Sequence, residues 1–101
     1  MTHVLDPTSP FANRPVEPDT RILFQSEAVV AGLPVLHEAW FWDGVGAESV
    51  IFLDKDVVGR DNAALEGLLR EANLVREDAS PTFSRTGSGF VFANFNFWTT
   101  D

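Results

Sequence analysis

Apolar positions are most concentrated near the end of the chain, in GFVFANFNFW, residues 89–98. Successive side chains of a strand point to opposite faces, so Phe90, Phe92 and Trp98 share one parity and Phe95 and Phe97 share the other. The pattern predicts a long strand with aromatic rings on both faces. It also raises the question of what covers the second face.

Three earlier segments have the β-branched and aromatic content of strands. RILFQSEAVVAG begins at Arg21, PVLHEAWFWDG begins at Pro34, and SVIFLD follows at residues 49–54. The expected turns are Gly32-Leu33-Pro34 and DGVGAE, residues 43–48. Residues 34–42 also permit a helix, because proline is favourable in a first helical turn. Two Trp residues that flank a Phe favour the strand.

One helix is predicted over residues 61–73 from apolar residues spaced i, i+3, i+4 and i+7, namely Leu65, Leu68, Leu69 and Ala72. Asp61 is a suitable N-cap, because its carboxylate can accept hydrogen bonds from the first free amides. Glu66 and Arg70 have the i, i+4 spacing of a favourable ion pair. After the helix, residues 82–85 and 90–98 are expected to form a hairpin through a turn at 86–89.

These elements predict an α+β fold for residues 21–101 as a single domain. The expected sheet is antiparallel and has about five strands, in the order strand, strand, strand, helix, strand, strand, with the helix packed on one face. Residues 1–20 hold Pro7, Pro10, Pro15 and Pro18. Proline removes a backbone donor and restricts the residue before it, so this segment is expected to be an irregular N-terminal arm.

The predicted sheet has more aromatic side chains than one helix can cover. An antiparallel sheet with a solvated face alternates apolar and polar residues, and the last strand does so only around Asn94 and Asn96. We therefore expect the second face to be covered in part by the arm, by another chain or by a strong bend of the sheet.

The charge of the chain narrows the class of partner. Fifteen acidic and seven basic residues give a formal net charge of −8. This disfavours direct binding to nucleic acid or to an anionic membrane, since both need basic surfaces. A basic protein partner, imitation of a nucleic-acid surface, or solubility alone would suit it.

Three further features of the sequence indicate the cellular compartment of the protein. The chain has no cysteine, which excludes disulfides and cysteine-based zinc sites. The first residues lack the pattern of a signal peptide, and no apolar run approaches the ~20 residues of a spanning helix. The sequence thus predicts a cytoplasmic protein.

No residue pattern indicates catalysis, a cofactor or a metal. DKDVVGRDN, which begins at Asp54, fails the calcium-loop pattern at two ligand positions, so helix capping explains its acids better. Ser88 lies in a glycine-rich turn without the spacing of a nucleophile elbow. His37 neighbours Glu38, which would point to the opposite face of a strand. A catalytic role for His37 would need an acid from another strand.

The candidate partner-binding residues are three tryptophans and the acids near them in sequence: Trp40, Trp42, Trp98, Glu38, Asp43 and Glu48. The tryptophans share a parity within their strands, so they could form one cluster if those strands are neighbours. Such a cluster is either an aromatic core beneath the helix or a binding surface, where Trp is enriched. An apolar patch rimmed by carboxylates would suit a basic partner.

Three functions remain open. The first is a non-enzymatic module that blocks or docks on a larger basic protein; phage-encoded inhibitors of nucleic-acid-handling machines have a similar composition. The second is a structural subunit that associates with itself or with an assembly. The third is a small-ligand binder or enzyme that uses His37.

Overall fold

The structure, a computed structural model, describes residues 6–85 and 88–99 of the chain. Within them, five antiparallel strands form one sheet and a single α-helix packs on it, which confirms the predicted α+β fold and element order. The sheet order is β1-β2-β3-β5-β4. The elements are β1 (Arg21–Val30), β2 (Leu33–Trp42), β3 (Val45–Leu53), the 3₁₀ turn η1 (Asp54–Asp56), α1 (Asn62–Glu71), β4 (Thr82–Arg85) and β5 (Phe90–Thr99).

Two-residue turns connect the first three strands. Ala31 and Gly32 have φ angles of 50° and 80°, and Asp43 and Gly44 have φ angles of 52° and 80°. Left-handed conformation at both central residues matches the twist of the flanking strands. The expected turn positions were therefore wrong: Leu33 and Pro34 belong to β2, and β3 begins at Val45. Residues 34–42 form a strand and not a helix.

The helix α1 agrees closely with its sequence pattern. Asp61 is the N-cap and accepts a hydrogen bond from the Ala64 amide at 2.8 Å. Leu65 and Leu69 are fully buried. Glu66 and Arg70 form the predicted i, i+4 ion pair at 2.8 Å. The expected turn between β4 and β5 lies partly outside the described residues, since 86 and 87 are not among them.

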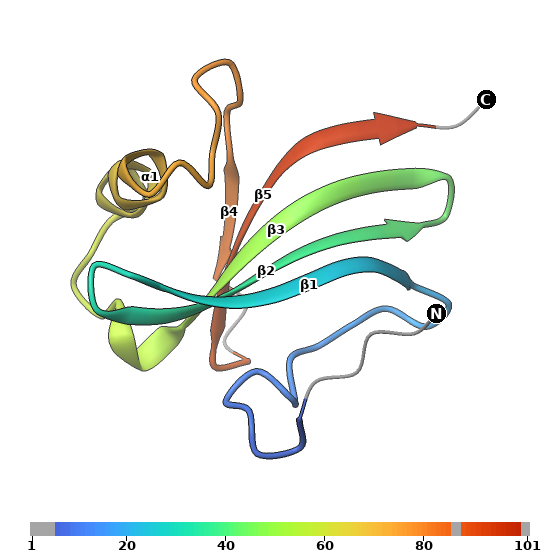
Figure 1. Ribbon diagram of the computed structural model, residues 1–101, viewed down its shortest axis with the longest axis horizontal. Helices are drawn as coiled ribbons and strands as arrows, with labels where there is room; N and C mark the ends of the chain where they lie inside the picture. The colour runs from blue at the N-terminus through green and yellow to red at the C-terminus, as the bar shows by residue number, and fades with distance from the viewer. Residues whose placement is uncertain (1–5, 86–87, 100–101) are drawn as a thin grey trace.

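The helix covers only one end of the sheet. Leu65 and Leu69 join a core with buried residues of the sheet such as Val35, Val50 and Phe52. Figure 1 shows α1 beside β4 and near the β1–β2 turn, whereas β2 and β3 run on past the helix toward the Asp43–Gly44 turn. The same face of the sheet is thus covered at one end and extends beyond the helix at the other.

The N-terminal arm covers the second face. Phe11 is fully buried and packs in a second core with Leu36, Ile51 and Phe90. The Phe11 and Phe90 ring centroids are 6.4 Å apart. Figure 1 shows the arm against the side of the sheet away from α1. Among the three expected sources of cover, the structure shows the arm.

We predict that Phe11→Ala lowers the free energy of unfolding by about 3–5 kcal/mol, because it removes a fully buried ring and leaves a cavity. Chemical denaturation followed by tryptophan fluorescence measures the change. The matched control is Val16→Ala, which removes an apolar group from an arm residue that is 45% exposed. An equal, small effect of both changes would show that the arm does not pack on the sheet.

Candidate functional site

The structure separates the three tryptophans. Trp40 and Trp42 alternate along β2 with Phe41, which lies opposite Gly46 of β3. Gly46 lies opposite Trp98 of β5 on its other side. Residues paired across antiparallel strands point to the same face. Trp98 therefore lies on the helix side with Phe41, whereas Trp40 and Trp42 lie on the arm side. The expected cluster of three rings does not form.

A β-bulge in β5 explains the separation. Glu48 pairs with Phe95 and Gly46 pairs with Trp98. Two residues of β5, Asn96 and Phe97, therefore face one residue of β3, Ala47. Asn96 has a left-handed φ of 57°. A bulge of this kind inserts one extra residue and shifts the parity of the residues after it. Trp98 consequently joins the face of Phe95, although the simple alternation assigned it to the face of Phe92.

Trp98 packs directly over the backbone of β3. A Cβ atom on Gly46 would lie 2.1 Å from Cε2 of the Trp98 ring. Such a distance is far below van der Waals contact, so only glycine leaves room for the indole at this position. Gly46 is buried while Trp98 remains 37% exposed.

The sheet beyond the helix presents an aromatic surface, which we call the open face. Phe24 pairs across with Ala39, and Phe41 and Trp98 flank Gly46 on the same side. Phe24 is 44% exposed and Phe97 is 54% exposed. Phe97 lines a hollow on this side together with His37 and Glu48. The open face consists of Phe24, Phe41 and Trp98.

His37 obtains its acid from the neighbouring strand. Its Nε2 lies 2.8 Å from Oε1 of Glu48, and Asn96 Nδ2 donates to Oε2 of the same carboxylate at 2.5 Å. The His37 ring also meets Phe24 edge-on, with centroids 5.4 Å apart, and stacks on Phe95. Glu48 is therefore a partner of His37 and Asn96, and it borders the open face.

The two-residue turn contains the signal that could have found this pair. A two-residue turn at Asp43–Gly44 pairs Trp42 with Val45. Counting back from this pair, Ala39 lies opposite Glu48 and His37 lies opposite Val50. His37 and Glu48 are then diagonal neighbours on one face, within reach of long side chains. The sequence interpretation missed the pair because it placed β3 four residues too late.

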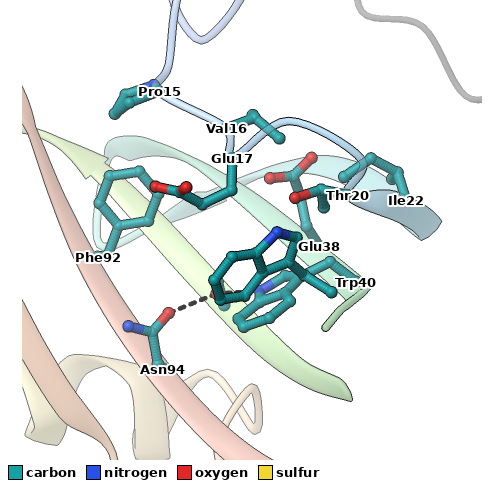
Figure 2. Close-up of a pocket in the computed structure, with 11 residues that line it drawn as sticks. Pro15, Val16, Glu17, Thr20, Ile22, Glu38, Trp40, Phe92 and Asn94 are labelled. Atoms are coloured by element: carbon teal, nitrogen blue, oxygen red, sulfur yellow. Dashed lines mark hydrogen bonds between the residues drawn. The ribbon is translucent and has the colours of Figure 1, made fainter. Parts of the chain in front are cut away.

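On the arm side, Trp40 and Trp42 line a pocket between the sheet and residues 15–20 (Figure 2). Its volume is about 260 Å³. A row of hydrogen bonds crosses its floor: Trp40 Nε1 donates to Ser49 Oγ at 2.7 Å, and the Ser49 hydroxyl donates to Asn94 Oδ1 at 2.5 Å. Trp42 Nε1 donates to the Pro18 carbonyl at 3.1 Å, which ties the arm to β2. The pocket is lined by Pro15, Val16, Glu17, Thr20, Ile22, Glu38, Trp40, Trp42, Ser49, Phe92 and Asn94.

Glu38 has a structural partner that the sequence did not reveal. It is only 3% exposed. Arg14 Nε donates to Oε1 at 2.8 Å and Arg14 Nη2 donates to Oε2, while Gln25 Nε2 also donates to Oε2 at 2.6 Å. This two-point pairing of a guanidinium with a carboxylate fixes both side chains. Glu38 thus anchors the arm and is not an exposed rim acid. Asp43 is exposed in the β2–β3 turn, where its left-handed conformation is tolerated.

We predict that Gly46→Ala lowers the free energy of unfolding by about 1–3 kcal/mol, because the new methyl group must displace the Trp98 ring. Near-ultraviolet circular dichroism and chemical denaturation measure the two effects. Gly67→Ala is the matched control. Its Cβ meets nothing within 4 Å on an exposed helix position, so stability should rise by about 0.5–1 kcal/mol. An unchanged Trp98 signal in Gly46→Ala would contradict the packing of the indole on Gly46.

We predict that Arg14→Met destabilises the protein by about 3–5 kcal/mol, because the Glu38 carboxylate is left buried without its counterion. The double variant Arg14→Met/Glu38→Met removes both charges and should recover most of that loss. Thermal or urea denaturation of the two variants measures the difference. A double variant less stable than the single one would contradict the interpretation.

Comparison of this chain with other proteins identified no related protein. Searches of protein-family models, of curated proteins and of solved structures each found no match to this chain. In residues 6–85 and 88–99, no helix has the length and apolar character needed to cross a membrane. The same residues contain no group of three or more His, Asp or Glu side chains placed to hold a metal ion.

Proposed function

We propose that this chain is a non-enzymatic module that binds a basic protein through the open face. The observation that carries the proposal is the uneven cover of the sheet: α1 packs over one end, and Phe24 and Trp98 beyond it are 44% and 37% exposed. Contiguous exposed apolar side chains mark interaction sites more often than isolated ones do. Trp is also enriched among the residues that dominate binding energy.

Charge supports a basic partner. The chain carries a formal charge of −8. Glu48 and Asp43 lie beside the open face, and the exposed Arg21 is paired with Phe41 at its edge. Arg76, in the hollow beside Glu48, is paired with Asp78. A long-range negative field speeds the approach of a cationic surface, and apolar contacts then hold the complex together.

A second copy of the chain fits the open face less well. Two copies would each carry −8 and would repel one another at low salt. The outer edge of β1 carries the charged residues Arg21 and Glu27, and its pairing is interrupted between Ile22 and Phe24. Charges and bulges on an edge strand oppose edge-to-edge pairing. Self-association therefore stays the second candidate.

The proposed action is to occupy a cationic groove on the partner, as an inhibitor of a nucleic-acid-handling protein would. We place this action in the cytoplasm, because a chain without cysteine needs no oxidising environment to fold. The His37–Glu48 pair supports a ligand-binding or enzymatic role as a further candidate, since it lines a hollow of about 470 Å³. Glu48 also accepts a hydrogen bond from Asn96, which gives this pair a structural purpose in holding the bulge.

We predict that Phe24→Ser/Trp98→Ser abolishes capture of a basic protein from cell extract without unfolding the sheet, because both side chains are partly exposed on the open face. The control is Val58→Ser, which removes an apolar side chain that is 78% exposed and lies after η1, away from the open face. Wild type and control should retain the same protein at low salt and release it as salt rises. Binding of the purified partner, measured by calorimetry, should show the same order.

Three outcomes would contradict the proposal: equal capture by the double variant, an acidic captured protein, or affinity independent of salt. Sedimentation at low micromolar concentration tests the second candidate. A wild-type dimer that the double variant loses would assign the open face to self-association instead.

A further inference from the structure

The arm-side pocket has the chemical character of a site for an organic cation. We propose that it binds an alkylated ammonium group, of the kind found in choline or in a methylated lysine side chain. The pocket lies on the opposite face of the sheet from the open face, so this inference does not depend on the proposed docking function.

The first observation is the set of aromatic rings. Trp40 and Trp42 from β2 and Phe92 from β5 line one pocket, and Pro15, Val16 and Ile22 supply the rest of its apolar wall. Figure 2 shows Phe92 and Trp40 on the sheet, facing the arm residues Pro15, Val16 and Glu17 across the pocket. The faces of aromatic rings carry partial negative charge, and they attract ammonium groups whose methyl substituents are easily desolvated.

The second observation is the sign of the charge in the pocket. Its lining contains Glu17 and Glu38 and no Lys, Arg or His. Arg14 offsets the charge of Glu38 in their buried ion pair. Among the residues that the structure describes, the Glu17 carboxylate forms no ion pair, and its side chain is exposed beside the rings. An anionic ligand would meet this charge without a counterion, whereas a cation would neutralise it.

The third observation concerns hydrogen-bond donors. Both indole N–H groups are already used, by Ser49 and by the Pro18 carbonyl, and the Ser49 hydroxyl donates to Asn94. Besides the Thr20 hydroxyl and the Asn94 Nδ2 group, the lining offers a ligand the aromatic rings and the Glu17 carboxylate. A quaternary ammonium has no N–H to satisfy, so it needs only such a surface and a nearby negative charge.

The size of the pocket limits the ligand. A volume of about 260 Å³ is slightly below the usual range of drug-sized sites, roughly 300–1,000 Å³. It accommodates a trimethylammonium group with a short attached chain. Because Pro15, Val16, Glu17 and Thr20 of the arm form one wall, the attachment of the arm by Arg14 and Trp42 also completes the site.

The test compares choline with 3,3-dimethylbutan-1-ol, which has the same shape without the charge. Binding to the full chain is followed by calorimetry and by NMR signals of the Trp40 and Trp42 indole N–H groups. Choline should bind about 5- to 30-fold more tightly than the alcohol, the range that a desolvated cation–π contact provides. Equal binding of the two probes, or no binding of choline, would overturn the inference.

Two variants locate the site. Phe92→Leu keeps apolar volume and removes one ring face, so choline affinity should fall about 3- to 10-fold. Glu17→Gln changes an exposed arm residue, so the fold should persist while choline affinity falls and depends less on salt. Val58→Ser should bind choline as wild type does. Unchanged choline binding in both Phe92→Leu and Glu17→Gln would overturn the assignment to this pocket.

A further titration tests whether the alkylated ammonium group comes from a free small molecule or from a modified protein. It uses a short peptide with one trimethyllysine, and the control is the same peptide with leucine at that position. Tighter binding of the trimethyllysine peptide than of choline assigns the group to a modified protein. Tighter binding of choline assigns it to a free small molecule. Both outcomes support the site, and failure of both probes to exceed their uncharged controls overturns it.

Discussion

The fold depends on how an irregular arm is held against the sheet. Arg14 reaches across to Glu38, and the buried carboxylate has both oxygens engaged by Arg14 and Gln25. Without this pair, Glu38 would be a buried charge in the centre of an apolar face, which is strongly unfavourable. The pair and the buried ring of Phe11 therefore act together: one satisfies the charge and the other fills the space. The described part of the arm, residues 6–20, has no helix or strand and still becomes part of the core.

The bulge at Asn96 has an equally large effect on the surface. It shifts Trp98 by one parity, so the aromatic residues are divided between the two faces of the sheet. The side chain of Asn96 holds Glu48, and Glu48 in turn holds His37. One left-handed residue thus positions a tryptophan, a carboxylate and a histidine. Bulges commonly redirect side chains in this way near functional surfaces.

The two aromatic surfaces differ in shape, which is why they suit different ligands. The open face is broad and continues beyond α1, so it suits a protein surface. The arm-side pocket is a smaller hollow with arm residues as one wall, so it suits a small group. Both gain from the negative charge of the chain, which attracts cations from a distance. The arm connects the stability of the fold to the pocket, because the same segment that covers the core also forms the pocket wall.

The sequence by itself determined the local elements. Alternation, the leucine spacing of α1 and the N-cap Asp61 depend on contacts within a few residues, so they could be read along the chain. It also showed that the sheet has more aromatic side chains than one helix can cover. Only the tertiary structure decided which rings meet. That outcome depends on the strand order, which puts β3 between β2 and β5, and on a bulge that resets parity in mid-strand. The partners of Glu38 and His37 likewise come from residues 24 and 11 positions away, and local patterns contain no information on such pairings.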